Sequence, residues 1–151
     1  MNGIELIIPG KPRGKGRPRF GNGTAYTDKE TAEYERLVRL TALQTGIKPL
    51  SGAVHMDITA YYPIPRSGSK ASRLKRERGE EYPLVRPDID NITKIIMDAL
   101  NGYAYADDKQ VISVTAIKKY GREPKVVVKV IYKEEKDEKR RTKIHALSNR
   151  C

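Results

Sequence analysis

The alternation of apolar and polar residues predicts a strand near the middle of the chain. Over residues 54–62 an apolar side chain occupies every second position, and polar residues such as Asp57 and Thr59 stand between them. A period of two is typical of a strand with one face in the core, and Pro63 is expected to end it. The inward positions are Val54, Met56, Ile58, Ala60 and Tyr62.

The stretch "YTDKETAEYERLVRLTALQTG" has a helical period instead. Thr27 and Glu30 have the spacing of a capping box, and Gly46 suits a helix end. We therefore expect a helix from about Asp28 to Thr45. Its predicted inner face consists of Tyr34, Leu37, Val38 and Thr41.

A second helix is predicted within "RPDIDNITKIIMDALNG", residues 86–102. At about 100° per residue, its apolar side chains form one stripe, and Asp90 and Lys94 lie opposite that stripe. Asp98 lies toward one edge, and Asp88 precedes the helix in an extended segment. The apolar stripe is Ile92, Ile95, Ile96, Ala99 and Leu100.

The remaining β-rich runs complete the predicted fold. Residues 4–8 form a short strand, and "QVISVTAIKKY" and "PKVVVKVIYK" are expected to pair as an antiparallel hairpin through "GREP". The predicted class is α+β, a two-layer β-α-β-α-β-β domain with two helices packed on a mixed sheet. We assign residues 1–133 to this domain and treat 134–151 as a charged tail.

The charge indicates a polyanionic partner. The chain has 151 residues, with 30 Lys plus Arg against 19 Asp plus Glu, a net charge of +11. Such an excess favours nucleic acid. The glycine- and proline-rich stretch at 9–23 is predicted to be a loop whose basic residues contact DNA phosphates, and residues 66–86 a mobile basic loop or a short exposed helix. The basic residues of the first loop are Lys11, Arg13, Lys15, Arg17 and Arg19.

Several classes of protein are excluded by composition. The single cysteine, Cys151, is the last residue and rules out an internal disulfide framework and a cysteine zinc site. No apolar run is long enough for a membrane span and the N-terminus lacks signal-peptide order, so we expect a cytoplasmic protein without a membrane partner. Most of the nine tyrosines are expected to be packing residues, and Tyr103 and Tyr105, which adjoin an acidic pair, are the ones to test for a place near DNA.

The carboxylates of the second helix and of "YADDK" are candidates for metal chemistry. Phosphodiester hydrolysis uses a divalent ion, and Mg²⁺ takes carboxylate, water and phosphate oxygens. Asp88, Asp90 and Asp108 could supply this cluster, and Lys94 a fixed cation for charge developing on the phosphate. Each acidic pair taken alone is also ordinary capping or turn chemistry.

Two other interpretations stay open. "PD" at 87–88 with "DDK" at 107–109 satisfies the PD-(D/E)xK nuclease pattern, which would make Lys109 the catalytic lysine. That pattern needs its acids on neighbouring strands, whereas a helix separates them here. A non-catalytic nucleic-acid-binding protein would keep the basic loops and tolerate loss of Asp90.

The stretch "RPDIDNITKIIMDALNGYAYADDKQV" closely resembles the RusA-like Holliday junction resolvases, which phages and prophages often encode. The basic loop and first helix also resemble that family. The resemblance implies a homodimer that uses Mg²⁺, with Mn²⁺ as an alternative, and cuts four-way junction DNA by paired symmetrical nicks in recombination and repair. It implies that Asp88, Asp90, Lys94 and Asp108 are catalytic, with Asp98 and Asp107 supporting them.

Overall fold

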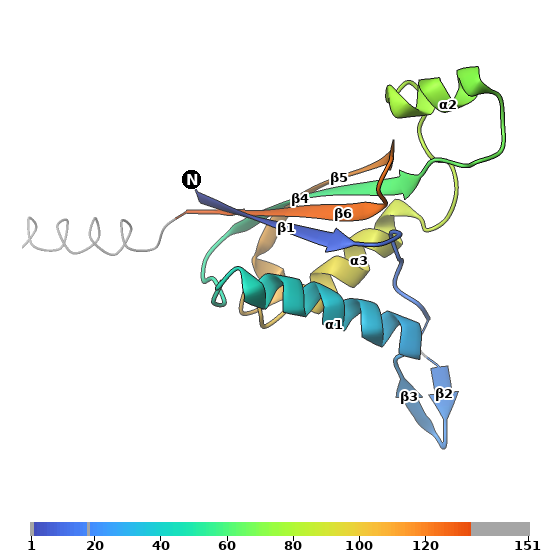
Figure 1. Cartoon of the computed structure of the whole chain (residues 1–151). Helices are drawn as coiled ribbons and strands as arrows, with labels where there is room; N and C mark the ends of the chain where they lie inside the picture. The colour runs from blue at the N-terminus through green and yellow to red at the C-terminus, as the bar shows by residue number, and fades with distance from the viewer. Residues whose placement is uncertain (1, 18, 134–151) are drawn as a thin grey trace, which may run out of the picture.

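The computed structural model describes residues 2–17 and 19–133. A four-stranded mixed sheet has the order β1-β6-β4-β5, with β4 and β5 parallel and the other pairs antiparallel. Helices α1 and α3 lie together against one face of this sheet (Figure 1). The predicted α+β class, with two helices on a mixed sheet, is confirmed. The bounds are β1 Asn2–Pro9, β4 Val54–Pro63, β5 Val111–Gly121, β6 Lys125–Tyr132, α1 Lys29–Gln44 and α3 Ile89–Leu100.

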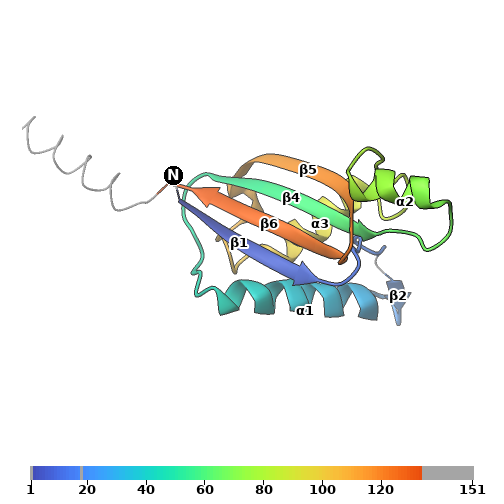
Figure 2. The same cartoon turned by 45° about the horizontal axis from the view of Figure 1, so that its top comes forward.

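The core lies between the sheet and these two helices. All five inward positions predicted for β4 are buried, as is the whole predicted stripe of α3. In register, Met56 of β4 stands opposite Val130 of β6 and Val114 of β5. Figure 2 shows the opposite face of the sheet turned toward the viewer, with α3 behind the strands and α1 along the lower edge.

Helix α1 has the predicted extent but a different cap. Asp28, and not Thr27, is the N-cap, and its carboxylate accepts a hydrogen bond from the Thr31 N–H at 2.9 Å. This hydrogen bond lowers the pKa of Asp28 below its usual value. The capping-box spacing therefore located the helix start to within one residue but named the wrong side chain.

The predicted hairpin of the last two strands is wrong, because β4 lies between β5 and β6. Gly121 at the end of β5 pairs with Pro63, and Lys125 at the start of β6 pairs with Tyr61, so the short link passes the end of β4. A Cβ on Gly121 would lie 3.0 Å from Tyr61 Cδ1, so glycine permits this close passage. Turn signals show where the chain reverses, but burial of β4 decides which strands pair.

A small hairpin interrupts the stretch predicted to be a loop. Strands β2, Arg19–Gly21, and β3, Thr24–Tyr26, pair through Asn22 and Gly23. Asn22 has φ 51° and Gly23 φ 76°, the left-handed values that a two-residue hairpin turn requires. The Asn-Gly pair was the sequence signal for this turn. The hairpin projects beyond the start of α1 with its side chains exposed (Figure 1).

The basic stretch at 66–86 contains a short exposed helix, the second of the two predicted alternatives. Helix α2, Lys70–Glu77, is capped by Ser69 and has no buried residue. It lies near the end of β5, where the Arg76 guanidinium stands over the Tyr120 ring at 5.5 Å. The predicted tail 134–151 falls outside the described residues, and no helix within them is both long and apolar enough to span a membrane.

Candidate active site

Helix α3 and the turn before β5 present polar side chains to one hollow. Asp90, Lys94 and Asp98 come from successive turns of α3, and Asp108 begins the 3-10 turn η1, Asp108–Gln110. Together with Val114 they line a hollow of about 580 Å³. Three of the four residues predicted to be catalytic, Asp90, Lys94 and Asp108, thus share one cavity with the predicted supporting residue Asp98.

Asp88 lies at the N-cap position of α3 but does not cap it. Its backbone is extended, with φ −72° and ψ 153°, and its side chain makes no capping hydrogen bond. The Tyr62 hydroxyl donates to the Pro87 carbonyl and holds the entry to the helix. Burial, and then the charge of Asp88, raise the pKa of Tyr62 to about 12. Capping therefore does not explain Asp88, whose carboxylate stays available for other contacts.

The turn that presents Asp108 is built by its neighbours. The Asp107 carboxylate accepts a hydrogen bond from the Lys109 N–H at 3.0 Å, and the Asp107 N–H donates to Gln110 Oε1 at 2.8 Å. The first of these bonds lowers the pKa of Asp107. Gln110 also donates to the carbonyl of Leu50 at 2.8 Å. Asp107 thus shapes the turn, while Asp108 faces the hollow.

Tyr105 ties the same turn to α3, and its burial removes it as a candidate for contact with DNA. Its side chain is fully buried, and its hydroxyl donates to the Met97 carbonyl at 2.8 Å. Burial raises its pKa, with a further contribution from Asp108 and Asp98. Tyr103 keeps an exposed ring, over which the Arg39 guanidinium stands at 5.6 Å.

Asp88 lines a neighbouring hollow of about 480 Å³ and not the one of Asp90. It shares that hollow with two arginines, Arg17 and Arg86. Sequence reasoning placed Arg86 only in a general basic stretch, although its position just before Pro87 and Asp88 was visible. The two hollows lie on either side of the first turn of α3.

The Asp90 and Asp108 carboxylates are ligands of the kind that Mg²⁺ takes in proteins. Within 2–17 and 19–133 no three Asp, Glu, His or Cys side chains are grouped closely enough to hold a metal ion. Mg²⁺, however, needs one or two carboxylates, with waters and substrate phosphates completing its shell. Asp90 and Asp108 face one hollow and form no salt bridge within the described part of the chain. Their donor chemistry therefore suits this ion.

The basic loop is fastened to the starts of both helices. The Lys15 N–H donates to the Asn91 carbonyl at 3.0 Å, and the Gly16 N–H donates to Thr31 Oγ1 at 3.1 Å. At Gly14 an added Cβ would lie 2.9 Å from the Asn91 Cβ. The loop consequently follows a fixed path between the acidic residues of α3 and the start of α1.

Two of the five basic residues predicted to bind DNA are engaged within the protein. The Lys15 ammonium pairs with Glu35 and, at 3.2 Å, with Asp98, and its side chain is 20 % exposed. Burial acts to lower the pKa of Lys15, but its hydrogen bonds to both carboxylates outweigh burial and raise it. Arg13 pairs with Glu30 at 2.8 Å yet remains half exposed. Lys11, Arg17 and Arg19 are exposed.

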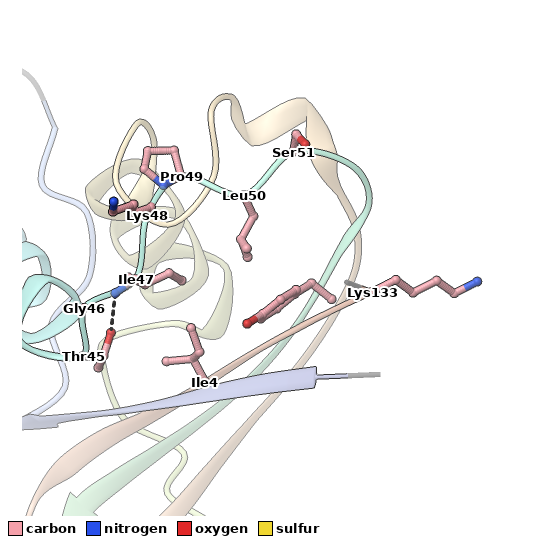
Figure 3. Close-up of a pocket in the computed structure, with 10 residues that line it drawn as sticks. Ile4, Thr45, Gly46, Ile47, Lys48, Pro49, Leu50, Ser51 and Lys133 are labelled. Atoms are coloured by element: carbon pink, nitrogen blue, oxygen red, sulfur yellow. Dashed lines mark hydrogen bonds between the residues drawn. The ribbon is translucent and has the colours of Figure 1, made fainter. Parts of the chain in front are cut away.

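A further hollow has no part in this arrangement. It measures about 600 Å³ and lies beside the loop that follows α1. Ile4 and Leu50 point into it and the Lys133 ammonium points away (Figure 3). None of the predicted site residues lines it.

The fold and the site define an α+β domain in which a fastened basic loop adjoins an acidic hollow that contains a lysine. The family model described as Endodeoxyribonuclease RusA matches residues 9–131. The chain therefore belongs to the RusA endodeoxyribonuclease family, as its sequence motifs predicted. It is also similar to "Uncharacterized protein YqaN" of Bacillus subtilis (strain 168), with 36% identity over 137 residues that cover 86% of this chain and 96% of the relative.

Proposed function

We propose that this protein is a Mg²⁺-dependent, structure-selective endodeoxyribonuclease that resolves Holliday junctions by paired symmetrical nicks. The observation that carries the proposal is the shared hollow of Asp90, Lys94 and Asp108 beside the basic loop. Membership of the RusA family supports DNA cleavage as the activity. Junction resolution in recombination and repair, a cytoplasmic location and a prophage origin are parts of the same proposal.

Asp90 and Asp108 are the residues that would hold Mg²⁺, or Mn²⁺ in its place, with Asp88 contributing from the neighbouring hollow. The bound ion would supply an activated water and neutralise charge on the phosphate. Lys94 would place its ammonium against the charge that develops on the phosphate or the leaving oxygen. Asp107 supports this group by shaping the turn of Asp108, and Asp98 supports it by holding Lys15.

The basic loop would hold the arms of a four-way junction through their phosphates. Lys11, Arg17 and Arg19 are exposed, and Arg13 is half exposed. Such contacts give affinity that is independent of sequence and falls steeply with salt. Lys15 contributes by fixing the path of the loop. Two opposed cuts need two sites, so we propose that the protein acts as a homodimer.

The PD-(D/E)xK alternative is less well supported. Asp88 stands at the start of a helix and Asp107 caps a 3-10 turn, so these acids do not lie on neighbouring strands. Lys94 lines the acidic hollow, whereas Lys109 is not among its lining residues. The non-catalytic alternative is opposed by the arrangement of a lysine between carboxylates in a hollow.

The deciding experiment is cleavage of a labelled four-way junction in Mg²⁺ beside a linear duplex of the same sequence. We expect paired nicks across the junction from the wild type and none from Asp90→Asn or Lys94→Ala. Lys109→Ala is the matched control and should keep its activity. Loss of cutting with Lys109→Ala but not Lys94→Ala would favour the PD-(D/E)xK alternative. Binding without cutting by the wild type would leave a DNA-binding protein.

A further inference from the structure

The segment between α2 and α3 exposes apolar side chains to solvent. Leu84 is 92% exposed, Val85 57% and Tyr82 55%. Single exposed apolar residues are ordinary on protein surfaces. Here, however, three of four consecutive residues are exposed, directly before the acidic motif. Burial in the core does not account for them.

The backbone of this segment is held in place while those side chains point outward. Pro83 between them is buried. The Lys118 ammonium donates to the Val85 carbonyl at 2.6 Å, and the Tyr62 hydroxyl donates to the Pro87 carbonyl. At the other end the Arg76 guanidinium pairs with Glu81 at 3.2 Å. A backbone fastened at several points keeps Leu84 and Val85 from turning back onto the core.

Charged residues of both signs surround the segment. Glu80 and Glu81 directly precede it, and Glu81 is paired with Arg76. Arg78 and Arg86 flank it, and both are exposed. Arg86 also lines the hollow of Asp88 and Arg17. The exposed arginines beside these apolar side chains suit DNA, because phosphates can meet the cations while base faces meet the apolar groups. Proteins that distort DNA insert leucine, isoleucine or proline side chains between base steps in this way.

We propose that Leu84 and Val85, with Tyr82 beside them, form an apolar wedge that packs against unstacked bases of the DNA next to the cleaved phosphodiester. This inference rests on the proposed function insofar as DNA is the substrate. The wedge would select DNA whose bases are already partly unstacked, such as the centre of a four-way junction, because less stacking is lost there. The segment that selects the substrate would then lie directly before the acidic motif that cuts it.

The test is fluorescence of 2-aminopurine placed at the centre of a four-way junction, measured with the full chain in Ca²⁺. The double variant Leu84→Ser/Val85→Ser is compared with Leu40→Ser/Leu43→Ser, which changes two leucines of α1 that are 46% and 52% exposed. We expect the wild type and the α1 variant to raise the fluorescence. The wedge variant should lose this rise and bind roughly tenfold more weakly.

Three outcomes would overturn the wedge. The wedge variant could raise the 2-aminopurine fluorescence as much as the wild type does, or both double variants could lose the rise equally. Light scattering could also show that the wedge variant has a changed oligomeric state. The last would make the segment a protein interface. Circular dichroism checks that each variant is folded. If the wild-type protein unstacks the junction but does not cut it in Mg²⁺, the wedge is supported and the proposed nuclease activity is refuted. Failure of the wedge can therefore be told apart from failure of the proposed function.

Discussion

The Lys15 ammonium lies 3.2 Å from the Asp98 carboxylate, on the side of α3 that also presents Asp90 and Lys94. The same ammonium pairs with Glu35 of α1. One lysine of the basic loop therefore joins both helices. Its ion pair also occupies the Asp98 carboxylate, which belongs to the acidic hollow. Asp90 and Asp108 are left to face the hollow without an ion pair among the described residues.

Replacing Lys15 with methionine should destabilise the protein, because Glu35 and Asp98 would lose their shared counterion. Part of this attraction is screened by solvent, so we expect a loss of about 1–2 kcal/mol in the free energy of unfolding. The measurement is urea denaturation. Arg13→Met is the matched control, since its pair with Glu30 is exposed, and should cost less than about 1 kcal/mol. Equal losses would show that Lys15 has no special structural role.

Replacing Gly14 with alanine should loosen the basic loop. The new Cβ would come within 2.9 Å of the Asn91 Cβ and 3.0 Å of the Pro87 Cβ, so the loop or α3 must shift. We expect a loss of about 1–3 kcal/mol in unfolding free energy, together with weaker DNA binding. Gly3→Ala is the control, because its Cβ would have ordinary contacts at 3.7 Å or more. A Gly14→Ala protein as stable as Gly3→Ala would contradict the tight packing.

The stability that the Asp28 cap contributes should depend on pH. The pKa of Asp28 is lowered in the folded state by hydrogen bonds from Thr31, so the contribution is present above the unfolded pKa of 3.8. It is lost as the pH falls through the lower folded value. Asparagine can cap a helix without a charge. The stability difference between wild type and Asp28→Asn should therefore shrink below pH 3.8, as measured by thermal unfolding from pH 7 to pH 2; a constant difference would refute this linkage.

Replacing Arg86 with glutamine should weaken DNA binding without changing sequence preference. Each phosphate contact that is lost should reduce the slope of log K against log salt by about 1. The measurement is fluorescence anisotropy with a four-way junction at several salt concentrations. Lys48→Gln is the control, because Lys48 lines the unrelated hollow beside the loop after α1. Equal slopes in both variants would remove Arg86 from the DNA-binding surface.

Local periodicity was sufficient to predict most of the secondary structure. The alternation in β4 and the apolar stripe of α3 depend on residues close in sequence, and both were confirmed as buried faces. The acidic motif also predicted the family, because its residue types and their spacing lie within one continuous stretch of sequence. The Asn-Gly pair at 22–23 is a local signal of the same kind and indicates the hairpin found there.

Relations between distant segments could not be obtained in this way. The place of β4 between β5 and β6 depends on which pairing buries the apolar faces of the whole sheet. Burial of Tyr105 likewise requires α3 and the following turn to close over it, which no local pattern expresses. The sequence by itself determined the two helices that pack on the sheet, the class of fold and the residue types of the site. The tertiary structure decided that Lys15 turns inward to Glu35 and Asp98, because long-range charge pairing outweighs the solvation of one lysine.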